Sequence, residues 1–198
     1  LGLLSRFFAD CPATRLDLHF EAVAGPQERL YDGEADLILH RVDKSDGRIE
    51  WVDLAKVPFV PVVAPGFLHG PMPRAIKPAL LRDYTQCVMR DTARHTPQQD
   101  YFTVEGARQC TVADQLMKKE IIVQGMGWGH MPRFLVEDEL RDGRLLSIAN
   151  RHLPGSVEDL VAARRTDRVQ GPVSNRLWQY LQKAAPALRR ALTSSRGR

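Results

Sequence analysis

The chain has 198 residues, of which 43% are hydrophobic and 26% charged. This balance is typical of a globular protein and excludes a disordered chain, and the length allows a sizeable core. The three cysteines, Cys11, Cys87 and Cys110, are odd in number and widely spaced, which excludes a disulfide-stapled scaffold. No apolar run reaches the ~18 residues that span a bilayer, and the start lacks the basic region of a signal peptide. We therefore expect a cytoplasmic protein with no membrane partner.

The net charge of +4 comes from the C-terminal end of the chain. Residues 184–198 hold four arginines and no acidic residue. Without those four, the 28 basic residues become 24 and equal the 24 acidic residues. Because proteins that bind nucleic acid usually present a basic face, the body of this chain is not expected to contact DNA directly.

The first third of the sequence predicts alternating helices and strands. Leu3, Leu4, Phe7 and Phe8 recur at spacings of three and four, which favours a helix, whereas alternation in residues 16–21 favours a strand. In chain order, the expected elements are a helix over 1–10, a strand over 16–21, a helix over 25–30 closed by Gly33, and strands over 35–39 and 57–64.

Residues 65–79 contain four prolines and two glycines, a composition that predicts a passage between two lobes. Later apolar patterns continue the alternation. The expected elements are a helix over 79–83, strands over 86–89 and 101–104, a helix with Val112, Leu116 and Val123 on one face, capped by Thr111 or Asp114 and stopped by Gly125, a helix over 132–140, a strand over 145–148 and a helix over 172–181.

This alternation predicts an α/β fold with two lobes of mixed, mostly parallel sheet flanked by helices and joined by two crossover segments. We place lobe I at residues 1–64 plus 149–198 and lobe II at residues 65–148.

Residues 125–132 form the most conspicuous motif, a glycine-rich string. It is similar to the dinucleotide fingerprint, but it follows a predicted helix, and His130 stands where the third glycine belongs. The other interpretation is a helix end and tight turn that needs close backbone approach, whose N–H groups can also receive a small anion.

The sequence offers no catalytic or metal motif. It contains no G-x-x-x-x-G-K-[ST], H-E-x-x-H or G-x-S-x-G, and its histidines are never three or four residues apart. We expect no catalytic residue, no metal and no cofactor. Acidic residues 137–139 are interpreted as a solvated helix face. Cys87 and Cys110 are either redox partners, if the fold brings them together, or unrelated core and surface thiols.

Four strings together resemble LysR-type transcriptional regulators. Residues 30–39 resemble an L-x-x-G-x-x-D segment of their effector-binding domain, and residues 123–132 its glycine-rich segment. Residues 140–146 resemble the L-x-x-G-x-L segment that follows it, and residues 171–181 resemble the last helix of the domain, in the same order.

The resemblance implies a fold like that of periplasmic binding proteins, with a small effector, for which we expect a carboxylate, bound between the lobes. It also implies a homodimer, a tetramer in the full-length protein, and promoter DNA bound through an N-terminal winged helix-turn-helix. We expect that domain and the family's first strand to be absent from this chain.

The resemblance also implies positions for both sites. For Trp128 we leave open an effector contact or a core side chain, and for Arg90 a carboxylate partner or a solvated charge. The implied effector-binding residues are Val23, Ala24, Gly25, His40, Pro65, Met89, Arg90, Gly127, Trp128, Gly129 and His130. The implied dimer-interface residues are Leu3, Leu4, Phe7, Phe8, Leu16, Leu18, Phe20, Val112 and Leu116.

Two other functions compete with the sensor interpretation. One is a solute-binding protein of similar fold, and the other is an α/β enzyme that uses the same cleft. An enzyme requires a nucleophile within hydrogen-bond reach of a base, and the sequence contains only isolated candidates.

Overall fold

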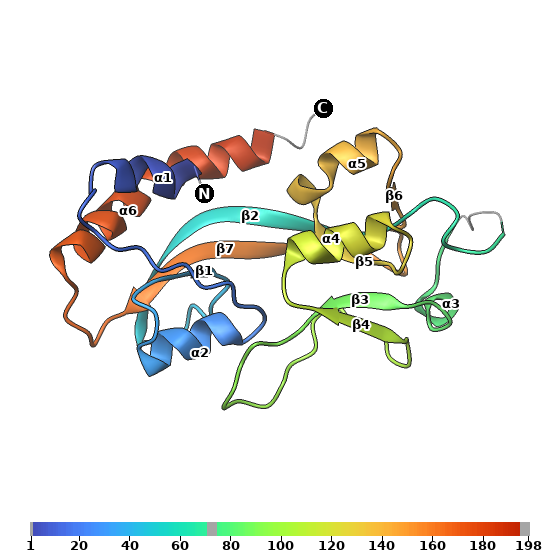
Figure 1. Cartoon of the computed structure of the whole chain (residues 1–198), viewed down its shortest axis with the longest axis horizontal. Helices are drawn as coiled ribbons and strands as arrows, with labels where there is room; N and C mark the ends of the chain where they lie inside the picture. The colour runs from blue at the N-terminus through green and yellow to red at the C-terminus, as the bar shows by residue number, and fades with distance from the viewer. Residues whose placement is uncertain (1, 71–74, 195–198) are drawn as a thin grey trace. The chain divides into compact units, whose positions relative to one another are not determined.

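A computed structural model describes residues 2–70 and 75–194 of the chain. The chain divides into two compact units: unit 1 comprises Leu1–Phe20, Pro26–Lys56 and Asp159–Arg198, and unit 2 comprises Glu21–Gly25 and Val57–Glu158. The elements are α1 (Gly2–Ala9), α2 (Gly25–Asp32), β1 (Ile38–His40), β2 (Ile49–Val63), α3 (Pro78–Leu81), β3 (Gln86–Met89), β4 (Gln109–Val112), α4 (Gln115–Val123), β5 (Gly129–Pro132), η1 (Arg133–Leu135), α5 (Glu137–Arg141), β6 (Leu146–Ser147), β7 (Ser156–Arg165) and α6 (Pro172–Ser194) (Figure 1).

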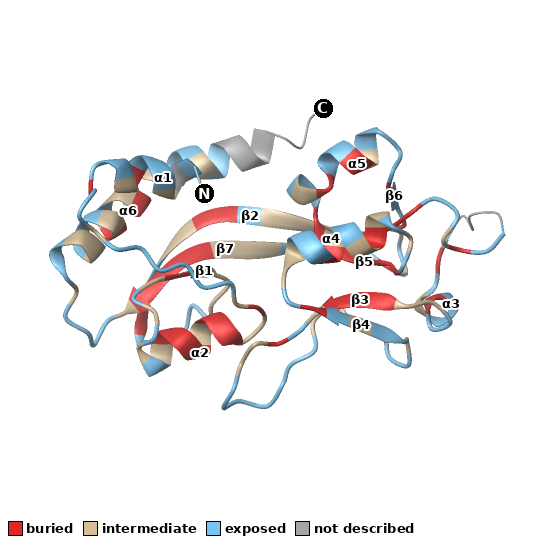
Figure 2. Cartoon of the chain, viewed as in Figure 1, coloured by how far each residue is buried: buried red, intermediate tan, exposed pale blue. Residues whose placement is uncertain are grey.

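Unit 1 is a sheet with helices on both faces. Its strands lie in the order β1, β7, β2, and β1 pairs antiparallel with β7. Successive side chains of a strand point to opposite faces. Accordingly, Val161 and Ala163 pack with Leu30 of α2, whereas Ala162 packs with Trp178 of α6. The buried stretches of α2 and β7 stand out in Figure 2.

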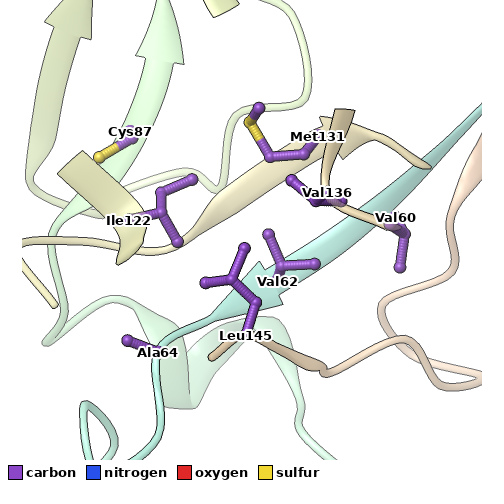
Figure 3. Close-up of a cluster of buried hydrophobic side chains, with 8 residues drawn as sticks. All are labelled: Val60, Val62, Ala64, Cys87, Ile122, Met131, Val136 and Leu145. Carbon is purple, nitrogen blue, oxygen red and sulfur yellow. The ribbon is translucent and has the colours of Figure 1, made fainter. Parts of the chain in front are cut away.

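Unit 2 contains two hydrophobic clusters. The second half of β2 pairs antiparallel with β5 and β6, and β3 pairs in parallel with β4. Val62 contributes to a cluster with Ile122 of α4 and Met131 of β5 (Figure 3). Its neighbour Val63 belongs to a second cluster, which contains Trp128. Strand alternation thus assigns adjacent residues of β2 to different cores.

Several predicted elements are confirmed. The first helix is α1, the strand over 86–89 is β3, and the short helices near residues 25 and 79 are α2 and α3. Asp114 caps α4, because its side chain accepts hydrogen bonds from the N–H groups of Leu116 and Met117. Gly33 and Gly125 follow α2 and α4 with φ of 75° and 69°, the left-handed conformation that closes helices.

The strands predicted over 16–21 and 101–104 are wrong, since neither segment pairs with a described strand. Alternation selects a face, but a strand also needs a neighbour with which to form hydrogen bonds. Strands β4, β5 and β7 were not predicted. The expectation of mostly parallel sheet is also wrong, because β1 with β7, β2 with β5 and β2 with β6 are antiparallel pairs.

Three helix predictions need correction. Leu116 is 64% exposed, and the buried residues of α4 are Lys118 and Ile122. The helix predicted over 132–140 is instead β5, the short turn η1 and α5. Glu139, expected on a solvated face, is buried and pairs with Lys119.

The prolines and chain crossings also differ from expectation. Helix α6 continues through Pro186 to Ser194, because Ala185 remains packed in the core of unit 1. Of the proline-rich residues 65–79, predicted to pass between lobes, residues 65–70 and 75–79 belong to unit 2, and residues 71–74 lie outside the described residues. The chain changes unit inside β2 and β7. Within the described residues, no helix has both the length and the apolar character needed to cross a bilayer.

Candidate functional site

In unit 2, the turn at Glu21–Gly25 is joined to the loop that follows β3. The N–H of Ala22 donates to Oγ1 of Thr92 (2.9 Å), and the N–H of Thr92 donates to the carbonyl of Ala22 (3.3 Å). Val23 has a φ of 59°, uncommon for a β-branched residue. Backbone strain of this kind persists where surrounding contacts hold it and is concentrated at functional sites.

Asp91 fixes this turn to the loop. Its buried carboxylate accepts three backbone hydrogen bonds: Oδ1 from Ala24 (3.1 Å) and Ala93 (3.0 Å), and Oδ2 from Gln99 (2.9 Å). Hydrogen bonds to an ionised acceptor are among the stronger ones in proteins. The sequence analysis did not single out Asp91, although an acidic residue two positions after a buried strand was an available signal.

Gly25 is required by the same packing. A Cβ at this position would lie 1.9 Å from Oγ1 of Thr92 and 2.8 Å from a carboxylate oxygen of Glu21. Three predicted site residues, Val23, Ala24 and Gly25, therefore form one turn held against residues 91 and 92.

Met89 and Arg90 lie at the end of β3, directly before Asp91 and Thr92, the two residues that hold this turn. The N–H of Arg90 donates to the carbonyl of Val112 (2.8 Å), which fixes its backbone. Its side chain is exposed, and no described residue accepts a hydrogen bond from its guanidinium or forms an ion pair with it. An anchored backbone with an unpaired guanidinium can bind a carboxylate in bidentate fashion.

The glycine-rich segment packs along β3. The N–H of Trp128 donates to the carbonyl of Thr85 (3.0 Å), and the N–H of Cys87 donates to the carbonyl of Trp128 (2.7 Å). A Cβ at Gly127 would lie 2.6 Å from Sγ of Cys87, and one at Gly129 would lie 2.6 Å from the carbonyl oxygen of Cys87. Close backbone approach therefore explains these two glycines, in agreement with the interpretation of the string as a tight turn rather than a dinucleotide fingerprint.

Gly125 lies beside Ala64, the residue that directly follows β2. A Cβ at Gly125 would lie 4.0 Å from that of Ala64. The following residue, Pro65, is exposed. This places the 64–65 turn near the start of the glycine-rich string.

Trp128 is a core side chain, with none of its surface exposed. It packs with Val63 and Leu81, and its indole Nε1 has no hydrogen-bond partner among the described residues. Of the two roles that the sequence left open for Trp128, the structure has the core one.

His130 is buried and its ring stacks on Phe102, with 4.6 Å between the centroids. Burial, together with the positive charge of the nearby Lys118, lowers the pKa of His130 to about 4. His130 is therefore neutral at pH 7 and supplies no positive charge to a carboxylate.

Lys118 is a buried cation that the sequence analysis missed. Its Nζ donates to the carbonyl of His130 (2.9 Å). Burial lowers the pKa of Lys118 to about 8, so the ammonium persists at pH 7. The available signal was its place four residues before the buried Ile122 on α4, which puts both on one helix face.

The remaining predicted residues lie elsewhere. His40 is in unit 1, where its Nδ1 lies 3.1 Å from the carbonyl oxygen of Arg41. Of the predicted dimer contacts, Phe7 is buried in unit 1 against the ring of Tyr180, and Val112 is buried in unit 2. The side chain of Leu3 lies outside the described residues, and Leu4 and Phe8 are half-buried. The exposed ones are Leu16, Leu18, Phe20 and Leu116.

Comparison with known proteins identifies relatives of this chain. The family model described as the LysR substrate binding domain matches residues 1–186. The chain is 27% identical over 156 residues to the probable HTH-type transcriptional regulator YhaJ of Escherichia coli, covering 78% of this chain and 52% of that protein. It is 26% identical over 149 residues to the uncharacterized HTH-type regulator YeeY of the same species, covering 73% and 47%. The chain thus spans about half the length of these curated relatives.

Solved structures share the fold. ArgP from Mycobacterium tuberculosis matches with a TM-score of 0.71 at 16% identity, covering 94% of this chain and 64% of ArgP. Full-length LysG from Corynebacterium glutamicum, with the effector Arg bound, matches with a TM-score of 0.69 at 17% identity, covering 93% and 62%. These similarities establish a mixed α/β fold like that of the regulatory domains of such proteins.

Proposed function

Because this chain belongs to the LysR substrate-binding-domain family, we propose that it is the effector-binding domain of a transcriptional regulator. Its curated relatives are transcriptional regulators, which favours this role over a solute-binding protein or an enzyme. The domain would change its conformation or stability on binding a small molecule, with different affinities for the two states.

The effector contacts that we propose lie on the turn at Glu21–Gly25 and at Met89 and Arg90. The observation that carries this assignment is the set of hydrogen bonds from Ala22 and Ala24 to Thr92 and Asp91. They preorganise a strained turn beside the end of a strand, which reduces the ordering cost of binding. Pro65 and His40 remain proposed contacts on the family resemblance alone.

The chemistry of Arg90 favours an effector that carries a carboxylate. Arg90 is an exposed and unpaired cation among the described residues of this site, whereas His130 is neutral at pH 7 and Lys118 is buried. LysG binds Arg, an amino acid that carries such a group. We propose the same class of ligand here, an amino acid or another small organic acid.

The rest of the regulator is proposed from the relatives. Units 1 and 2 would be the two lobes of the domain. A helix-turn-helix segment, such as the names of YhaJ and YeeY indicate, would bind promoter DNA in the cytoplasm. A homodimer would cover the exposed Leu16, Leu18, Phe20 and Leu116, because large exposed apolar groups mark interaction surfaces. Sedimentation equilibrium at micromolar concentration tests this, and a monomeric mass would contradict it.

The effector proposal is tested by a thermal-shift screen of the chain against amino acids, aromatic acids, other small carboxylates and sugar phosphates near millimolar concentration. A ligand at a hundred times its Kd adds about 2.7 kcal/mol to the free energy of unfolding. We expect a carboxylate to raise the Tm of the wild type and to lose this effect in Arg90→Gln.

The matched control is Arg133→Gln, which removes another exposed and unpaired arginine of unit 2. It should keep the full shift. A screen without any selective shift, or a shift equal in the wild type and Arg90→Gln, would contradict the proposed site.

A further inference from the structure

Cys87 and Cys110 face each other across the parallel strands β3 and β4. The register pairs Cys87 directly with Cys110. Paired residues of adjacent strands lie about 4.8 Å apart and project to the same face of the sheet. That separation falls within the range of about 4.4 to 6.8 Å between Cα atoms that a disulfide requires.

The two thiols also meet in the folded unit. After burial, the neighbouring Cys110 thiol is the next cause that raises the pKa of Cys87. Both are free, and both pack in the cluster that contains Ile122 and Met131 (Figure 3 draws Cys87). The third cysteine, Cys11, belongs to unit 1. The fold thus brings Cys87 and Cys110 together, which is the condition under which the sequence allows them to be redox partners.

We propose that Cys87 and Cys110 are a reversible oxidation site that closes to an intramolecular disulfide on reaction with a hydroperoxide. In the first step, the Cys110 sulfur attacks the peroxide, an S–O bond forms as the O–O bond breaks, and the leaving alkoxide or hydroxide takes the thiol proton. In the second step, the Cys87 sulfur attacks the sulfenic sulfur, and the S–O bond breaks as the S–S bond forms. Water leaves with the second thiol proton, so two thiols lose two electrons and the peroxide gains them.

The order of attack follows from access. Cys110 is half-buried, whereas Cys87 has no exposed surface. Burial raises the pKa of Cys87 to about 12, and the ammonium of Lys118 opposes this shift. Because a thiolate is the nucleophile in the closing step, the disulfide forms slowly at pH 7. If that step limits the rate, it increases about tenfold per pH unit.

The disulfide would close a loop that carries part of the proposed effector site. Residues 88–109 lie between the two cysteines and include Met89, Arg90 and Asp91. Oxidation would therefore tie both ends of this segment covalently while leaving its residues chemically unchanged. The disulfide itself does not depend on the proposed effector, so its test is independent of that function.

The experiment treats the chain with hydrogen peroxide at pH 7 and pH 8.5 and quenches it with an alkylating reagent. Tryptic peptides are then mapped by mass spectrometry without reduction. Trypsin releases Cys87 in the peptide 83–90, Cys110 in 109–118 and Cys11 in 7–15. We expect a cross-linked species of 83–90 with 109–118, lighter by two hydrogen atoms than its parts, which dithiothreitol reverses. It should accumulate faster at pH 8.5.

Two variants control the assignment. Cys11→Ser should keep the cross-link, and Cys110→Ser should abolish it while its circular dichroism spectrum stays that of the wild type. If Cys87→Ser fails to fold, Cys110→Ser alone decides the outcome. The proposal is overturned if Cys110 proceeds to sulfinic acid while Cys87 remains alkylatable, or if cross-links involve Cys11 or two copies of the chain.

Discussion

Asp91 offers a graded test of how the turn and the loop are joined. Its Oδ1 accepts from the N–H groups of Ala24 and Ala93, and its Oδ2 accepts from Gln99. Asp91→Asn keeps one carbonyl oxygen for the first two donors but turns an NH₂ group toward the third. Asp91→Ala removes all three acceptors.

The magnitudes follow from these counts. A hydrogen bond to a charged acceptor contributes about 1.5 to 3 kcal/mol, and water replaces part of each loss in a loop that is half exposed. We expect Asp91→Asn to lower the free energy of unfolding by about 1 to 2 kcal/mol and Asp91→Ala by about 3 kcal/mol. Asp100→Asn, a control on an exposed carboxylate of the same loop, should change it by less than about 0.5 kcal/mol.

Urea unfolding measures the loss in the free energy of unfolding for each variant. Amide hydrogen exchange, measured by NMR, shows which of the three hydrogen bonds is lost. The Gln99 amide should exchange faster in both variants, whereas Ala24 and Ala93 should lose protection only in Asp91→Ala. Equal effects of the two substitutions, or unchanged exchange at Ala24 in Asp91→Ala, would refute the idea that this carboxylate fixes the turn.

The remaining predictions concern packing, pH and oxidation. Gly129→Ala should destabilise the chain by about 1 to 3 kcal/mol, because its Cβ would meet the carbonyl oxygen of Cys87. The control Gly171→Ala, whose Cβ would lie in open space, should leave the stability unchanged. Equal urea midpoints for the two variants would contradict this prediction. The pKa of His130 is lowered to about 4 in the folded chain, whereas it is ~6.5 in the unfolded chain. Between these pH values the imidazole is protonated in the unfolded state but neutral in the folded state. Stability should fall from pH 6.5 to 4 by about 3 kcal/mol more in the wild type than in His130→Phe, and parallel pH profiles would exclude this. Closing the disulfide between Cys87 and Cys110 should add about 3 kcal/mol for a loop of this length, and an unchanged urea midpoint after oxidation would count against an unstrained disulfide.

Local signals in the sequence identified most helices. The N-cap Asp114, the closing glycines Gly33 and Gly125, and the apolar face of the last helix act within a few residues, so they can be recognised without tertiary contacts. The end of α6 was misjudged, since Pro186 removes one hydrogen bond but tertiary packing keeps the helix.

Strands were less predictable because pairing is not local. Residues 16–21 alternate as a strand does, yet no described strand pairs with them, while β4 and β7 found partners that no local pattern revealed. The orientation of the pairs depends on topology in the same way. Alternation alone therefore could not show that β1 with β7, β2 with β5 and β2 with β6 pair antiparallel.

The candidate effector site was proposed from resemblance rather than from chemistry. Three of its residues, Val23, Ala24 and Gly25, form one hydrogen-bonded turn, and Arg90 is exposed and unpaired. Asp91 and Lys118, which organise these surroundings, were missed because burial of a charged group depends on tertiary structure. Conversely, Trp128 looked available in the sequence but fills a core.

The central claim is that a small carboxylate binds at the turn and the end of β3. Its most direct test is the amide ¹H–¹⁵N NMR spectrum of the chain, recorded with and without the compound that gives the largest thermal shift. We predict that the largest chemical-shift changes fall on residues 21–25 and 89–93 and vanish in Arg90→Gln. Changes centred on other segments, or unaltered by Arg90→Gln, would contradict this placement of the effector.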